Sequence, residues 1–242
     1  MVGLGTVLNI IGIAGGGAIG AIAGHRMRED SRVLTTDLLG LVTGLSAALS
    51  VKAVLSDKLS AAVGTTWPLF IVLAALLIGA SIGSLLRIEA RLELFGETLK
   101  NRFAKEDGGF VEGFLSASLI FCIGPLAIMG AFDDALGVGI DKLVLKTVLD
   151  FFASIAFAAS LGWGVAASAI AVGVYQGALT VLGLVLGSIW DAAQIDAMTA
   201  VGGLLLMAIS LKLLNIKHIA IGNVLPALFV APVIVQLIVA FS

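Results

Sequence analysis

The stretch WPLFIVLAALLIGASIGSLL, residues 67–86, contains no charged side chain. A helix needs about 20 predominantly apolar residues to cross a hydrocarbon core roughly 30 Å thick. Backbone groups surrounded by lipid must form their hydrogen bonds within their own segment, so this stretch is predicted to be a transmembrane helix.

Charged side chains are scarce along the whole 242-residue chain: 60% of its residues are hydrophobic and 12% are charged. They gather in short clusters between apolar stretches of about 18 to 25 residues, each long enough to cross a bilayer. We therefore predict an all-α polytopic membrane protein, with the lipid bilayer as a partner and residues 1–242 forming a single transmembrane domain. Eight spans are predicted, or seven if a proline-containing span is re-entrant. They cover about 3–24, 33–51, 67–86, 110–130, 143–160, 163–187, 197–214 and 218–240.

Lys and Arg are unequally divided between the two sides of the membrane if the eight spans alternate in direction. Ten of the 14 follow spans one, three and seven, and four lie on the opposite side. Because Lys and Arg concentrate in cytoplasmic loops, these three loops are predicted to be cytoplasmic. Both termini are then expected outside the cytoplasm.

The longest polar stretch is RIEARLELFGETLKNRFAKED, residues 87–107. Its apolar Ile88, Leu92, Phe95 and Leu99 recur at helical spacing, which predicts an amphipathic helix on the cytoplasmic interface. This helix is either a connector between spans three and four or a docking surface.

A shift of 163 residues superimposes spans one and two on spans six and seven without a gap. An offset of five spans reverses direction across the membrane, so the copies would form an inverted repeat, an architecture that recurs in transporters. The halves 1–86 and 163–242 would be joined by 87–162; a chance match among glycine-rich helices is the alternative. The matches place Gly20, Gly24, Thr36 and Gly40 on Gly183, Gly187, Thr199 and Gly203.

Glycines recur at four-residue intervals in three spans. Small residues at this spacing let helix backbones approach closely in lipid, so they predict helix packing. The partner is either a helix of the same chain or a second copy in a homo-oligomer. The packing glycines are Gly12, Gly16, Gly20 and Gly24 in span one, Gly79 and Gly83 in span three, and Gly183 and Gly187 in span six.

Two glycine motifs typical of enzymes occur in the wrong context. The GxGxxG match at 15–20 needs a strand before it, yet it lies in a predicted membrane helix. The GxSxG match at 79–83 needs a strained turn and a histidine partner. We therefore predict no enzymatic activity and no cofactor, nor any nucleic-acid partner. The lone Cys122 is predicted to be a small core residue.

Asp150 lies in the apolar stretch LVLKTVLDFFASIAFA, residues 143–158. A carboxylate inside a span is costly unless it is paired or hydrated, so it is a functional candidate. The alternative is a pair with Lys146 on the same helix face, because residues four apart are neighbours on a helix.

Several uncharged polar side chains also fall inside the predicted spans. Taken singly, each is expected to hold helices together by hydrogen bonds. Together with Asp150 they predict one polar cavity, whose other members are Asn9, Tyr175, Gln176, Asn223, Ser154 and Ser116.

Gly124-Pro125 in the fourth span is a candidate break in a membrane helix. Proline frees a backbone carbonyl, and irregular backbone at this depth is tolerated only where protein or water satisfies it. The dipeptide therefore predicts either a simple kink or a half-helix end that contributes to the site.

Several motifs carry a resemblance to a known family along nearly the whole chain. They are GTVLN (5–9), GSLLRIEARLELFG (83–96), SASLIFCIGPLAIMGAFDD (116–134), LKTVLDFFASIAFA (145–158), YQGALT (175–180) and GNVLPAL (222–228). The chain resembles the bacterial membrane proteins of domain of unknown function 554, the YdfK/YqgA-like proteins. The resemblance implies a multi-pass protein of the bacterial inner membrane and assigns no reaction.

Two functions remain as hypotheses. The first is a secondary transporter or channel for a small ion or solute, with a polar site at the bilayer midplane. Asp150 would be its charged centre, proton-coupled or cation-binding, and Asn9 and Gln176 would be neutral ligands; an organic anion held by a helix N-terminus is a further option. The alternative is a membrane assembly or regulatory protein that acts through glycine-rich helix packing.

Overall fold

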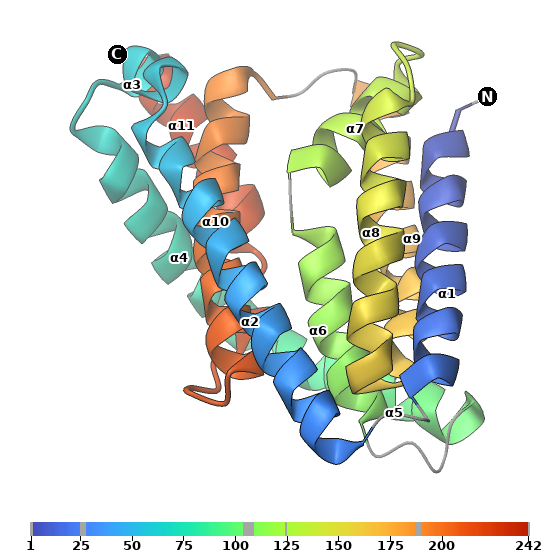
Figure 1. Ribbon diagram of the computed structural model, residues 1–242. Helices are drawn as coiled ribbons and strands as arrows, with labels where there is room; N and C mark the ends of the chain where they lie inside the picture. The colour runs from blue at the N-terminus through green and yellow to red at the C-terminus, as the bar shows by residue number, and fades with distance from the viewer. Residues whose placement is uncertain (1, 25–27, 104–108, 124, 187–189, 242) are drawn as a thin grey trace. The chain divides into compact units, whose positions relative to one another are not determined.

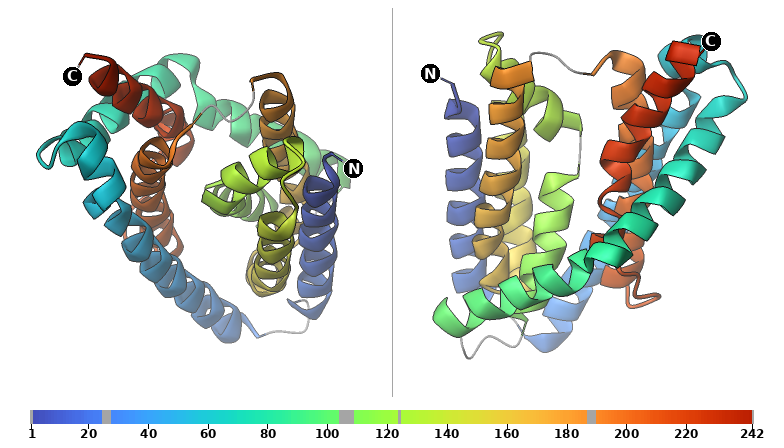
Figure 2. Two further views of the ribbon diagram at one scale, coloured as in Figure 1. Left: turned by 90° about the horizontal axis from the view of Figure 1, so that it is seen from above. Right: turned by 180° about the vertical axis from the view of Figure 1, so that it is seen from behind.

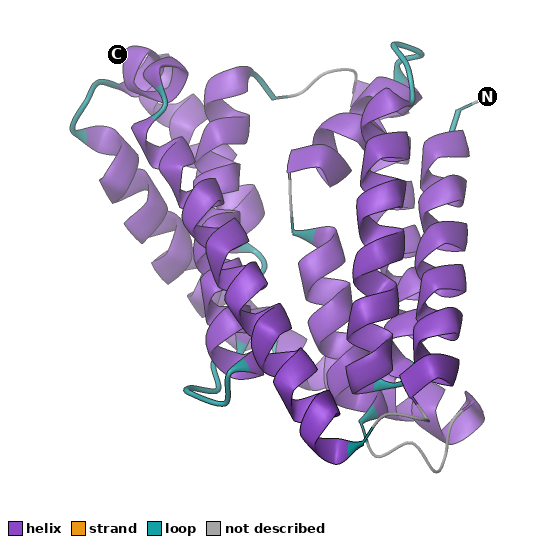
Figure 3. Ribbon diagram, in the orientation of Figure 1, coloured by secondary structure: helices purple, strands orange, loops and turns teal. Residues whose placement is uncertain are grey.

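The chain is helical over nearly its whole length in the computed structural model, shown in Figure 1. Helices make up 87% of it, and the described residues contain no strand, as Figure 3 shows. The prediction of an all-α polytopic membrane protein is confirmed. The structure describes residues 2–24, 28–103, 109–123, 125–186 and 190–241.

Seven helical segments within these ranges are long and apolar enough to cross a membrane, judged by length and composition. An eighth candidate is a broken pair, α6 (Phe110–Cys122) and α7 (Pro125–Ala135), bent by 63°. The predicted spans 3–24, 67–86, 143–160 and 163–187 agree with these elements to within two residues, whereas the last helix begins nine residues after the predicted start at 218. The seven segments contain α1 (Leu4–Gly24), α2 (Glu29–Val51), α4 (Trp67–Leu86), α8 (Asp141–Leu161), α9 (Gly164–Leu186), α10 (Ala192–Leu213) and α11 (Ala227–Phe241).

Shorter elements complete the chain. The predicted amphipathic helix is α5 (Ile88–Phe103), and a 3-10 turn, η2 (Ile221–Val224), precedes α11. After α2 the chain continues through η1 (Lys52–Leu55) into α3 (Asp57–Val63). The sequence predicted that this apolar segment ends at residue 51. With η1 and α3 it continues to Val63.

A local hydrogen-bond motif explains why α10 begins five residues before its predicted start. The Asp191 carboxylate accepts from the Gln194 backbone N–H at 2.9 Å, and the Gln194 side chain accepts from the Asp191 N–H at 2.8 Å. This reciprocal capping box satisfies two of the backbone donors that a helix start leaves unpaired.

The helices divide into two compact units, each built from two separate parts of the chain. Unit 1 comprises residues 1–39 and 92–189, and unit 2 comprises residues 40–91 and 190–242. This division differs from the predicted repeat halves, since each unit takes residues from both ends of the sequence.

In unit 1, α1 lies against α8 and α9, as Figures 1 and 2 show. The glycine stripe of α1 faces α8: a Cβ on Gly12 would contact Thr147, and one on Gly20 or Gly24 would overlap the backbone of Ile155 or Ala159. The partner of this stripe is therefore a helix of the same chain.

The order of these contacts also fixes direction, because residue numbers rise together along α1 and α8. The two helices are parallel, whereas α1 and α9 are antiparallel, with Gly17 beside Ala166 and Thr6 beside Thr180. If α2 and α4 each cross the membrane once, α8 returns parallel to α1 only if the α6–α7 pair crosses as well. This favours eight spans over seven.

The apolar face of α5 is packed within unit 1. Leu99 is buried with Phe110 and Phe114 of α6, and Leu92 packs against this cluster. The rings of Phe95 and Phe114 meet edge to face with their centres 5.8 Å apart. The amphipathic face of α5 thus covers α6.

In unit 2, close approaches at glycine join α2 to α10 and α4 to α11. The Ser210 hydroxyl donates to the Gly40 carbonyl at 2.7 Å, and a Cβ on Gly203 would lie 2.7 Å from the Val51 backbone nitrogen. A Cβ on Gly79 would lie 2.5 Å from Cα of Ala227.

In unit 1, Gly183 packs against Phe132 and Ala135 of α7, while Gly187 lies outside the described residues.

Candidate functional site

One face of α8 carries a polar stripe, because residues four apart lie above one another on a helix. Its members are Lys142, Lys146, Asp150 and Ser154. The exposed fraction of the side chain falls from 38% at Lys142 to 8% at Lys146, and Ser154 is fully buried. The stripe therefore leads from the surface of unit 1 into its interior.

Asp150 is held by groups from two helices. Lys146 Nζ donates to Asp150 Oδ2 at 2.5 Å, and Asn9 Nδ2 of α1 donates to the same oxygen at 3.1 Å. The ion pair considered in the sequence analysis is therefore present, and Asn9 joins it.

Asn9 also connects this pair to α9. Its Nδ2 donates to Gln176 Oε1 at 2.8 Å, and both side chains are completely buried. Three of the predicted site residues, Asp150, Asn9 and Gln176, thus lie together in unit 1. The parallel packing of α1 on α8 and the antiparallel packing of α1 on α9 bring them to one level.

Several buried polar atoms of unit 1 find no hydrogen-bond partner among the residues that the structure describes. Such an atom costs about 1–3 kcal/mol if nothing meets it, so water or a ligand is expected there. The hydrogen bonds from Lys146 and Asn9 to Asp150 both fall on Oδ2. The unpartnered atoms are Asn9 Oδ1, Gln176 Nε2, Tyr175 Oη, Ser116 Oγ and Ser118 Oγ.

The two predicted serines differ. Ser154 donates to the Phe151 carbonyl at 2.8 Å and packs against Gly16, so its hydroxyl already has a partner. Ser116 lies buried on α6 with its hydroxyl unpartnered, as does Ser118, which the sequence analysis did not single out. A buried serine in a helix normally donates to a carbonyl of its own helix. The residue type alone therefore could not show that the Ser118 hydroxyl lacks a partner within the described residues.

The predicted break in the fourth span coincides with the end of α6 at Cys122 and the start of α7 at Pro125. Ile123 has left the helical conformation, with φ −84° and ψ 105°. Gly124 lies outside the described residues. Cys122, the last residue of α6, lies beside this break and is half-buried.

Asn223 belongs to unit 2 and has a different set of partners. Its Oδ1 accepts from the Glu89 backbone N–H at 3.0 Å, and the Glu89 carboxylate accepts from the Gly222 N–H at 2.5 Å. This reciprocal arrangement fastens the start of α5 to η2.

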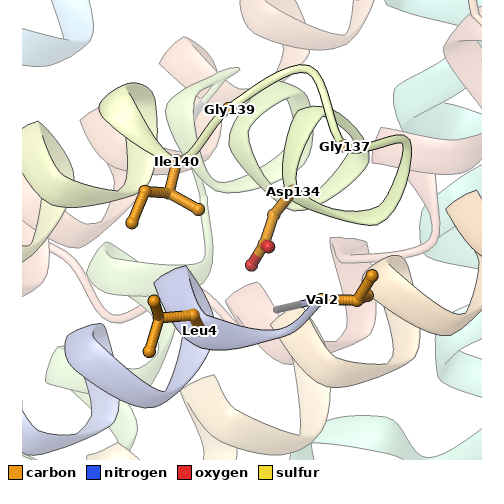
Figure 4. Close-up of a pocket in the computed structure, with 6 residues that line it drawn as sticks. All are labelled: Val2, Leu4, Asp134, Gly137, Gly139 and Ile140. Carbon is orange, nitrogen blue, oxygen red and sulfur yellow. The ribbon is translucent and has the colours of Figure 1, made fainter.

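Asp134 lines a pocket of about 260 Å³ at the start of α1, drawn in Figure 4. Its two carboxylate oxygens accept from the backbone N–H groups of Gly3 at 3.2 Å and Gly5 at 3.0 Å. The carboxylate, supplied by α7, therefore caps the first turn of α1. Each of its oxygens already accepts one hydrogen bond, which indicates a structural role for this carboxylate.

We expect Asp134→Ala to lower the free energy of unfolding by about 1–2 kcal/mol, because it removes a helix cap. The neighbouring Asp133→Ala breaks only a part-exposed pair with Lys142 and is expected to cost less than about 1 kcal/mol. Thermal unfolding in detergent compares the two variants. Equal destabilisation by both would contradict the capping role.

Comparisons with known proteins identify a family and two relatives. The family described as Protein of unknown function (DUF554) matches residues 4–236. The chain is 30% identical over 238 residues to the "Uncharacterized membrane protein YdfK" of Bacillus subtilis (strain 168), covering 98% of each chain. It is 31% identical over 243 residues to the "Uncharacterized protein YqgA" of Escherichia coli (strain K12), covering 94% of each. No solved structure matches it. The chain therefore belongs to the DUF554 family.

Proposed function

We propose that this membrane protein transports a small ion or solute, as a secondary transporter or channel, through a polar site centred on Asp150. The observation that carries the proposal is a buried carboxylate in a membrane-span candidate, bonded within a group drawn from three helices. Ionisable side chains inside membrane helices are costly, and those that persist mark substrate or ion pathways.

The unpartnered atoms favour a binding role over a purely structural one. Within the described part of the chain, Asn9 Oδ1 finds no donor and Gln176 Nε2 no acceptor, although the two amides are already joined by one hydrogen bond. A group that served only to hold helices together would gain by pairing these atoms with protein. Because these two atoms have no protein partner among the described residues, they support a site that binds water and a polar ligand alternately.

We further propose that the fold contains the inverted repeat. Shifted by 163 residues, α2 covers 192–214, and α10 runs from Ala192 to Leu213. The proposed equivalents also pair antiparallel within one unit: α1 with α9, α2 with α10, and α4 with α11. An in-plane pseudo-two-fold axis relates a helix to a copy of opposite direction, so this pairing supports the repeat.

We propose a bacterial inner-membrane protein with both termini outside the cytoplasm, on the charge distribution of its loops. We also propose that it has no enzymatic activity, because its GxGxxG match lies within α1 and its GxSxG match within α4. The rival is an assembly or regulatory protein that binds partners through glycine stripes. It is less well supported, because the stripe of α1 is already filled by α8.

The test is flux into proteoliposomes over a panel of monovalent cations and small metabolites, normalised to folded protein. Asp150→Asn is expected to reduce flux of the transported species about tenfold or more, equivalent to 1.4 kcal/mol or more. Asp141→Asn, the same change at an exposed position of α8, is the control and should transport like the parent. Unchanged flux in Asp150→Asn removes Asp150 from the mechanism, and a parent without flux counts against transport.

A further inference from the structure

The Asp150 site contains its own cation. The Lys146 ammonium lies on Asp150 Oδ2, and both side chains are nearly buried, at 8% and 11% exposed. An ammonium group carries three N–H donors, yet Lys146 has a single hydrogen bond to the described residues. Its attachment to the site is therefore one charge-assisted contact at the end of a flexible side chain.

The group that holds this ammonium also contains oxygens of the kind that a small inorganic cation prefers. Lys146 and Asn9 both donate to Asp150 Oδ2. The buried Asn9 Oδ1 finds no hydrogen-bond partner among the described residues. Carboxylate and amide oxygens are typical ligands of hard cations. Without the ammonium, the group would carry one negative charge, which a single monovalent cation balances.

Lys146 also has a route out of the site. The polar stripe of α8 places Lys142 one turn nearer the surface, where its side chain is more than a third exposed. A lysine can extend its apolar stem along a helix and carry its charged end toward water. Displacement from Asp150 therefore does not require the charge to enter lipid.

We propose that the Lys146 ammonium is a tethered counter-cation, which occupies the Asp150 site in the absence of ligand and competes there with a free monovalent cation. The proposal rests on the transport function above and specifies its ligand class. Competition keeps the site electrically neutral in both states: either the ammonium or the free ion balances Asp150. It also weakens binding of the free ion, which favours release.

Equilibrium binding of radiolabelled Na⁺ to the purified protein tests this directly, with unlabelled K⁺ and Li⁺ as competitors. Lys146→Gln and Lys146→Met remove the tethered charge, and both are expected to bind Na⁺ about tenfold more tightly than the parent, or better. Lys142→Gln, one turn away on the same face, is the matched control and should keep the parent affinity. Adding Asp150→Asn to Lys146→Gln should abolish the gain.

Two further measurements guard against misfolding and against a merely structural role. Na⁺ should raise the melting temperature of Lys146→Gln and Lys146→Met more than that of the parent, because it replaces a lost charge. Lys146→Arg keeps the charge and should keep the parent affinity. A purely structural lysine would instead give stability changes with no change in Na⁺ affinity.

The proposal is overturned if neither Lys146→Gln nor Lys146→Met binds Na⁺ more tightly than the parent, or if tight binding survives Asp150→Asn. Binding in detergent needs no transport, so the two hypotheses can fail separately. Tight binding by Lys146→Gln with no flux in the parent would remove transport alone. Cation flux in the parent, with parent Na⁺ affinity in Lys146→Gln and Lys146→Met, would contradict the role of Lys146 as a tethered counter-cation and leave the transport hypothesis standing.

Discussion

Replacing Asp150 with alanine is expected to lower the free energy of unfolding by about 3–5 kcal/mol, because it leaves a buried ammonium without its counter-charge. Lys146 has no other acceptor among the described residues, and only 8% of its side chain is exposed. The loss should exceed that from any single hydrogen bond, which contributes about 0.5–1.5 kcal/mol.

The matched variant is the double replacement Lys146→Met with Asp150→Ala, which removes both charges. It should recover most of the lost stability, since an apolar pair of similar volume often replaces a buried ion pair at little cost. Heat or denaturant unfolding in detergent gives the unfolding free energies of the four proteins in the cycle: the parent, Lys146→Met, Asp150→Ala and the double variant. A double variant as unstable as the sum of the two single variants would show that the charges do not interact.

Gly20→Leu is expected to destabilise unit 1 by about 3 kcal/mol or more, the upper end of what overpacking costs. A Cβ at this position would lie 2.9 Å from Cα and C of Ile155, and backbone atoms of α8 cannot yield as a side-chain end can. The parallel helices would have to separate, and α1 would carry Asn9 away from Asp150.

Gly15→Leu is the control for helix propensity and added apolar volume. It lies on the same helix, yet a Cβ there meets nothing within 4 Å. We expect it to leave the unfolding free energy unchanged or to raise it by up to about 1 kcal/mol, the gain in helix propensity. Melting temperatures in detergent distinguish the two variants, and a similar loss from both would contradict the role of the α1–α8 contact.

The spans could be predicted because bilayer thickness sets a minimum apolar length, which α1, α4 and α8 each meet. The start of α3 could not be predicted, since a seven-residue helix has too few turns to show a clear period in its apolar residues. The break before Pro125 was predictable because proline cannot continue an interior helix hydrogen-bond pattern.

The candidate site was predictable in its members more than in its arrangement. Asp150 stood out by charge, and its pair with Lys146 followed from four-residue spacing. The meeting of Asn9 with Gln176 depends on which helices pack together and in which direction, and periodicity within one helix carries no such information. For the same reason the sequence carries no information on whether Asn223 lies near Asp150, and that grouping stays a prediction.

The interleaved course of the chain has a consequence for biosynthesis. Unit 1 can be completed once residue 189 has been made, but α4 of unit 2 must wait until α11 (Ala227–Phe241) has been made. At about 5–20 residues per second, the ribosome needs roughly 8–30 seconds to translate from residue 91 to residue 242. Throughout that interval, the glycine surface of α4 lies open to lipid or to a chaperone.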